Sequence, residues 1–148
     1  FERVLKEAIG RFIPRVKELL LSDVSVYEKI ELFCHEYISM AMENPYIPLF
    51  VLSEVNRQPE VFISKMFSGG LPDFSVFVRQ LDEEIEAGRM RKISPVQLLM
   101  NMMGMCVFPF VGKPILQALM GLDELQFRMV MEQRKQQVAS FVLNSIRT

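Results

Sequence analysis

The chain has 148 residues, which suits one compact domain over 1–148. Half of the residues are apolar and 24% are charged, a composition that excludes intrinsic disorder. The 17 Lys and Arg against 18 Asp and Glu give a net charge of −1, far from the strongly basic face that grips phosphate backbones, so we expect no DNA or RNA binding by these residues alone.

The cysteines, the first residues and the most apolar segment bear on the cellular compartment of the protein. Cys34 and Cys106 lie within apolar runs and form no CxxC motif, which favours a reducing compartment, and we expect the cytoplasm. The chain begins at Phe1 within a helical pattern, so we interpret it as part of a longer protein. No signal peptide is visible, because the first twenty residues are rich in charge. The most apolar segment, 96–111, is too short to span ~30 Å of hydrocarbon, so we expect no membrane association.

The apolar residues recur with a helical period along almost the whole chain, and no stretch alternates long enough to predict a strand. We therefore predict an all-α protein of about eight or nine helices. The expected helices cover, in chain order, 1 to 21, Ser25 to Asn44, 46 to 56, 59 to 67, Phe74 to Gly88, Ser94 to Phe108, a short piece near Pro114, and Asp123 almost to Thr148.

Local signals set the ends of these helices. Ser25–Glu28 and Asp123–Gln126 have the spacing of capping boxes, in which each side chain bonds the backbone at the other end of the pair. Asn44-Pro45 should stop the second helix. Pro14 is expected to kink or split the first helix, and Pro109 to end the very apolar one.

The segment Val96–Phe108 is apolar nearly all round, and such a helix must be covered on every side. In a chain this small, we expect one face to meet the core and the opposite face to meet a second copy. Gln97, Asn101 and Gly104 form its only polar or small stripe, which permits close approach of a partner helix or a hydrogen bond to a ligand.

The last helix combines an apolar seam with a polar midsection, a pattern that fixes one register in a symmetric pair. We therefore predict a homodimer paired chiefly through Val96–Phe108 and Leu125–Ile146. The alternative is an ordinary amphipathic helix that packs on its own core. The residues expected at the interface are Gln97, Phe108, Phe127, Met131, Arg134, Val138 and Phe141.

Side chains for catalysis or metal binding are scarce. His35 is the only histidine and lies opposite the apolar stripe of its helix, as a surface residue would. The acidic run 82–86 places consecutive carboxylates on different faces, and the loop 68–70 lacks the GxxxxGK[ST] pattern. Cys34 and Cys106 with His35 do not reach a metal-ligand set. We expect no enzyme, no metal and no cofactor.

Eleven Met and twelve Phe, with no Trp, provide soft apolar surface. Methionine repacks easily and recurs at promiscuous binding surfaces, and apolar walls with a few polar groups are typical of a small-molecule pocket. The alternative is that these residues are plain core. The residues themselves therefore predict a helical, dimeric domain with an apolar cavity as one of two open interpretations.

The order of short motifs resembles the effector-binding domain of TetR-type bacterial transcriptional repressors. Segment 27–54 contains a helix that ends in an NP turn and a short helix with the family's "L…E" pattern. Segment 87–98 is similar to the family's "GxIRxxDPxxL" junction, 104–110 to the apolar helix after it, and 127–141 to the terminal helix. The resemblance covers nearly the whole chain in the right order.

The resemblance implies an orthogonal multi-helix bundle whose last long helices form a four-helix bundle in the dimer. It implies a ligand-sensing and dimerisation domain, in which an apolar or amphipathic small molecule moves the linking helix and releases operator DNA. The family's helix-turn-helix headpiece, which carries the DNA contacts, is absent, and Phe1–Leu5 resembles the start of the linking helix. The alternative is a helical protein–protein interaction module with no small-molecule pocket.

Under this resemblance, the pocket lining should include residues from helices that face one another around the core. These residues are Tyr37, Phe50, Met66, Phe74, Phe77, Met100 and Asn101. Asn101 is one of few polar groups on its helix. It would give a ligand a directional hydrogen bond or, if it faces a second subunit, set the register of the dimer.

Overall fold

The computed structural model describes residues 2–148, so the predicted helix start at Phe1 lies outside the described residues. Over 2–148 the chain forms eight α-helices and no strand, which confirms the all-α class; Met90 and Arg147 make one isolated antiparallel bridge. The helices are α1 (Glu2–Leu21), α2 (Val26–Glu43), α3 (Ile47–Arg57), α4 (Pro59–Met66), α5 (Ser75–Glu86), α6 (Pro95–Val111), α7 (Lys113–Met120) and α8 (Glu124–Ile146).

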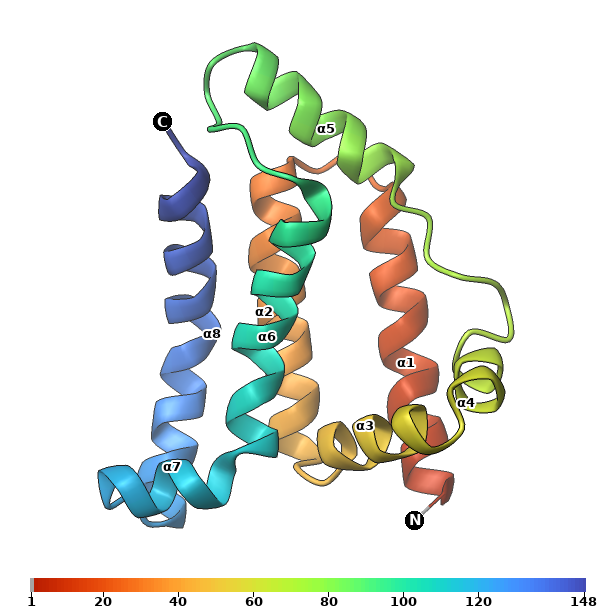
Figure 1. Ribbon diagram of the computed structural model, residues 1–148, viewed down its shortest axis with the longest axis vertical. Helices are drawn as coiled ribbons and strands as arrows, with labels where there is room; N and C mark the ends of the chain where they lie inside the picture. Colours follow the sequence, from red (N-terminus) through yellow and green to blue (C-terminus); the bar gives the residue numbers. More distant parts are fainter. Residues whose placement is uncertain (1) are drawn as a thin grey trace.

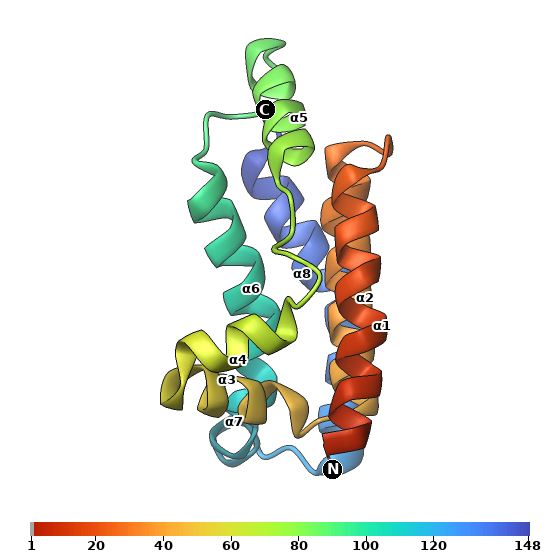
Figure 2. The same ribbon diagram turned by 90° about the vertical axis from the view of Figure 1, so that its right-hand side faces the viewer.

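Four helices, α1, α2, α6 and α8, run along the long axis of the molecule (Figure 1). The helix α5 lies across the end where α1 joins α2, and α3, α4 and α7 lie at the opposite end (Figures 1 and 2). The helix α8 runs antiparallel to α2, and α6 packs alongside both (Figure 1). The helix α2 therefore packs against three other long helices, α1, α6 and α8.

The main core forms around α2, whose buried residues recur every three or four positions and so share one face. They pack against the buried faces of α6 and α8, with Phe77 and Leu81 of α5 closing one end. The buried residues of this core include Val26, Ile30, Cys34, Ile38 and Ala41 from α2, Leu98, Met102 and Cys106 from α6, and Val138, Val142 and Ile146 from α8. A separate small cluster of Leu5, Ala8 and Ile47 joins the start of α1 to α3.

The predicted capping signals act at the helix ends. The Gln126 backbone N–H donates to Asp123 Oδ1 at 2.8 Å and the Asp123 N–H donates to Gln126 Oε1 at 2.9 Å, which confirms this capping box. Ser25 provides half of a box, because its Oγ accepts from the Glu28 N–H at 3.2 Å. The helix α2 ends at Glu43, directly before Asn44-Pro45, as predicted.

The two proline predictions need correction. Of the two effects predicted for Pro14, a kink or a split, the split does not occur, because α1 runs unbroken from Glu2 to Leu21, and α6 continues through Pro109 to Val111. A proline has no N–H, so Pro109 leaves the carbonyl of Met105, four residues earlier, without its helical partner. The Arg134 Nη2 of α8 donates to this oxygen at 3.0 Å. A side chain from another helix therefore replaces the missing backbone bond.

A buried lysine closes the joint between α1 and α2. Lys29 is 2% exposed, and its Nζ donates to the carbonyl of Leu20 at 2.8 Å. Leu20 lies in the last turn of α1, where carbonyls have no partner within the helix. Lys29 therefore acts as a C-terminal cap for α1, supplied from the next helix.

Candidate functional site

A cleft of about 740 Å³ lies between α1, α3, α4 and residues 68 and 69. The lower part of α1 lies beside α3 and α4 in Figure 1. Small-molecule sites are concave and measure ~300–1,000 Å³. The cleft therefore has the size of a ligand site, and three separate elements supply its walls.

The cleft has an apolar floor with an aromatic pair. On α1, Leu5, Ile9 and Ile13 recur every four residues, so they face the same side of that helix. From α3 and α4, the rings of Phe50 and Phe62 meet edge to face with centroids 6.4 Å apart. The remaining apolar side chains of the floor are Pro14, Val61 and Met66.

Charged side chains of one sign predominate around this floor. Four cations, Lys6, Lys17, Arg57 and Lys65, line the cleft with a single carboxylate, Glu54. Arg57 Nη2 lies 2.6 Å from Glu54 Oε2, so that pair satisfies itself. Among the described residues, neither Lys17 nor Lys65 has an ion-pair partner.

The structure brings together only two of the seven residues predicted to line a pocket, Phe50 and Met66. Tyr37 packs instead in an aromatic group with Phe12 and Phe33, at centroid distances of 5.6 and 6.2 Å.

The other four predicted residues lie elsewhere. Phe74 and the buried Phe77 meet edge to face at 6.5 Å beneath α5, at the main core. Met100 is 61% exposed and Asn101 is also exposed, both on the outer face of α6. Neither of these α6 residues lines the cleft.

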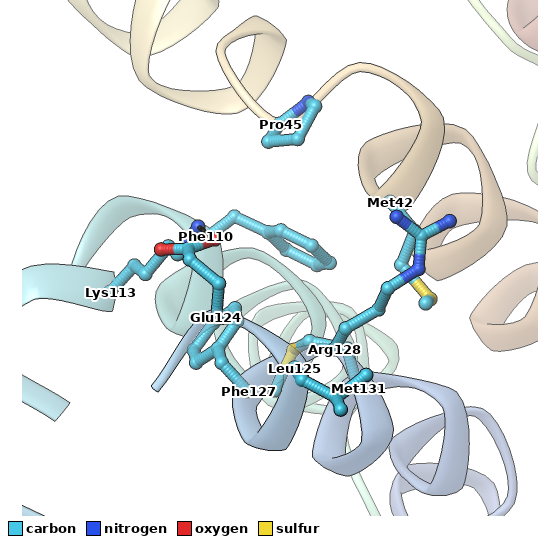
Figure 3. Close-up of a pocket in the computed structure, with 9 residues that line it drawn as sticks. All are labelled: Met42, Pro45, Phe110, Lys113, Glu124, Leu125, Phe127, Arg128 and Met131. Carbon is cyan, nitrogen blue, oxygen red and sulfur yellow. Dashed lines mark hydrogen bonds and ion pairs between the residues drawn. The ribbon is translucent and has the colours of Figure 1, made fainter. Parts of the chain in front are cut away.

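A smaller pocket of about 300 Å³ lies where α2, α6, α7 and α8 meet (Figure 3). Phe110 lies between Pro45 and the residues of α8 in that view. The Lys113 Nζ lies 2.8 Å from Glu124 Oε2 and 5.1 Å from the centroid of the Phe127 ring. Lys113 and Glu124 thus pair with each other, whereas Arg128 lines the pocket without a partner among the described residues, and none of the predicted pocket residues lines it. The larger cleft is the better candidate site.

The seven residues predicted for the dimer interface divide between core and surface. Phe127, Met131 and Val138 belong to the buried core of the single chain. Arg134 is half-buried, and its side chain donates to the carbonyl of Met105. Gln97, Phe108 and Phe141 are exposed, the last at 62%. With them on the outer faces of α6 and α8 are other exposed apolar residues, namely Val96, Met100, Met103, Leu125 and Met129.

The remaining reactive groups form no site. Cys34 and Cys106 are free and buried, and the neighbouring Cys34 thiol together with burial raises the pKa of the Cys106 thiol. His35 is exposed, as predicted. Within residues 2–148, no group of three His, Cys, Asp or Glu side chains could hold a metal ion.

The length and apolar character of the helices bear on whether any of them could span a membrane. In the described part of the chain, no single helix has both the length and the apolar character of a membrane span; α6 and α7 have them only as a pair, across a bend of 74°. No protein-family model matches the chain, and no curated protein matches it either.

Proposed function

We propose that the chain is the ligand-sensing and dimerisation domain of a TetR-type transcriptional regulator, a repressor, and that its cleft binds an apolar or amphipathic small molecule. The observation that carries the proposal is the cleft between α1, α3 and α4, with its apolar floor and its few polar groups. The resemblance in the sequence supplies the regulatory class. The charged groups of the cleft are four cations and one carboxylate, which Arg57 pairs.

The attachment of α1 supports a mechanism of release. The first half of α1 packs through the small cluster of Leu5, Ala8 and Ile47, whereas its last turn, with Leu20, belongs to the main core. A ligand that enters the cleft acts on this first half and on α3 together. By the resemblance, α1 continues from a headpiece, so its movement changes the spacing of two headpieces in a dimer and releases the operator. DNA is bound only through the headpiece.

A binding screen tests the cleft. A thermal-shift screen with a chemically mixed library should give hits among apolar and amphipathic compounds, and a compound at ten times its Kd should raise Tm by about 4 °C. Phe62→Ala removes a wall of the cleft and should abolish that rise. Phe74→Ala is the matched control, because Phe74 lies outside the cleft, and it should leave the rise unchanged. Stabilisation by polar metabolites alone would contradict the proposal.

The proposal also requires a homodimer, paired through the outer faces of α6 and α8. These helices pack side by side and expose large apolar side chains, including Met100, Phe108 and Phe141. On α6, Gly104 lies between Met100 and Phe108 in the sequence. A Cβ added there would meet nothing within 4 Å, so a partner helix can approach closely. Sedimentation at micromolar concentration should give twice the chain mass of 17.2 kDa.

Phe141→Asp should weaken this dimer by at least about a hundredfold in Kd, because pairing would bury an unpaired charge. The control is Leu32→Asp, at an exposed apolar position on α2, a helix outside the proposed interface. It should sediment like the unmodified chain. A monomeric chain, or equal weakening by both substitutions, would contradict the proposed interface.

The second candidate function is a helical protein–protein interaction module without a small-molecule pocket. The observation that favours it is the exposed apolar surface of α7, where Ile115, Leu119 and Met120 are all more than half exposed. This function predicts that no compound in the screen gives a shift that Phe62→Ala removes. The same thermal-shift experiment therefore separates the two.

A further inference from the structure

The charge of the cleft is opposite to that of the whole chain. The chain carries a net charge of −1, yet the cleft gathers four cations around a single carboxylate, which Arg57 already neutralises. Low-dielectric walls lined by one sign of charge focus the field and raise the local concentration of the opposite ion. The cleft should therefore attract anions and repel cations.

Two of these cations belong to the end of the cleft formed by residues 65–69. Lys17 is half-buried, and a Cβ placed on Gly69 would lie only 3.6 Å from its Nζ, so the ammonium group lies over that glycine. Lys65 lines the same cleft from the last turn of α4. In the described chain neither ammonium has an ion-pair partner or a hydrogen-bond acceptor.

The rest of the cleft is apolar next to this pair of charges. Ile13 and Ile9 of α1 lie one and two turns before Lys17 on the same side of the helix, and Phe62 precedes Lys65 by three residues. A molecule that pairs with both lysines would therefore lay the rest of its body on apolar and aromatic side chains. A wholly polar anion would leave that floor uncovered.

We propose that the cleft takes an anionic amphiphile, meaning a carboxylate or sulfonate attached to an aromatic or aliphatic body, with the anion held by Lys17 and Lys65. This inference rests on the proposed function, since it names the chemical class of the effector. Neutral analogues bind by the floor alone, and cationic analogues are rejected by the unpaired ammonium groups.

Two fluorescent probes with the same aromatic body separate the contributions. 1-Anilinonaphthalene-8-sulfonate carries an anion, and N-phenyl-1-naphthylamine is its neutral counterpart. The anionic probe should bind about tenfold more tightly, as two partly screened ion pairs allow, and the difference should shrink with added salt. The double variant Lys17→Gln/Lys65→Gln should abolish the difference without changing binding of the neutral probe. Lys92→Gln, at an exposed lysine outside the cleft, is the control and should change neither.

The outcomes separate this inference from the proposed function. Equal affinities for both probes, or a preference for the anion that survives loss of both lysines, would overturn the anionic class. Binding of the neutral probe that Phe62→Ala weakens would still support the cleft as a ligand site. If neither probe binds in a way that Phe62→Ala weakens, then both the inference and the proposed function fail.

Discussion

Replacing Lys29 with alanine is expected to lower the free energy of unfolding by about 3 kcal/mol. Lys29 is 2% exposed, so the substitution removes a buried aliphatic stem as well as the bond to the Leu20 carbonyl. Truncation of a long buried side chain to alanine costs about 2–5 kcal/mol. Release of the desolvated ammonium group offsets part of the loss. Chemical denaturation should show the effect, whereas Lys92→Ala at an exposed site should change the free energy by less than about 0.5 kcal/mol.

The pH dependence identifies the ammonium group itself. Burial lowers the pKa of Lys29 below its ordinary value of 10.5, and the nearby Arg79 lowers it further. A depressed pKa in the folded state means that stability rises as pH increases from the folded value to 10.5, and falls again as pH drops. The difference in unfolding free energy between the chain and Lys29→Met should therefore grow with alkaline pH. A difference that stays constant up to pH 10.5 would contradict a buried, charged Lys29.

Arg134→Met is expected to lower the free energy of unfolding by about 2 kcal/mol. A hydrogen bond from a charged donor contributes about 1.5–3 kcal/mol, and its loss leaves the Met105 carbonyl unsatisfied opposite Pro109. Arg128→Met is the control on the same helix, because Arg128 is exposed and has no bonding partner among the described residues.

The double-mutant cycle with Pro109→Ala tests the cause. Alanine at this position restores an N–H that can bond the Met105 carbonyl, so Arg134→Met should cost about 1 kcal/mol less in that background. Chemical denaturation of the four chains measures the coupling free energy. Strict additivity of the two substitutions would show that Arg134 does not replace the backbone bond.

Helix starts and stops could be predicted where the cause is local. The Asp123–Gln126 capping box and the stop at Asn44-Pro45 depend on residues within a few positions, and both are found as predicted. The end of α6 could not be predicted, because the group that compensates for Pro109 is Arg134, a residue of another helix. A tertiary contact decided what the local rule left undetermined.

The faces of α8 show a second limit. Its apolar seam predicted one stripe, but Met131 and Val138 enter the core while Phe141 points outward. Helical period identifies apolar positions, and only the packing of α2 and α6 decides which of them are covered. The same ambiguity placed Met100 and Asn101 in the predicted lining, whereas both lie on the outer face of α6.

The cations of the cleft had no signal in the sequence. Lys17, Arg57 and Lys65 come from three helices and belong to no motif, so only the fold reveals that they line one cleft. Phe50 and Met66 could be proposed because apolar residues on short helices must face some partner. Their shared site with α1 followed from the arrangement of α3 and α4.

Methyl NMR of methionine during titration with N-phenyl-1-naphthylamine tests most directly whether the cleft is the ligand site. Met66 lines the cleft, whereas Met42 and Met131 line the smaller pocket, so each hollow has its own reporter. An aromatic ligand in the cleft should shift the Met66 methyl resonance in a saturable way, at one equivalent per chain, and leave Met42 and Met131 unchanged. Saturable shifts of Met42 and Met131 with an unmoved Met66, or no saturable shift at any of the three, would contradict the cleft as the effector site.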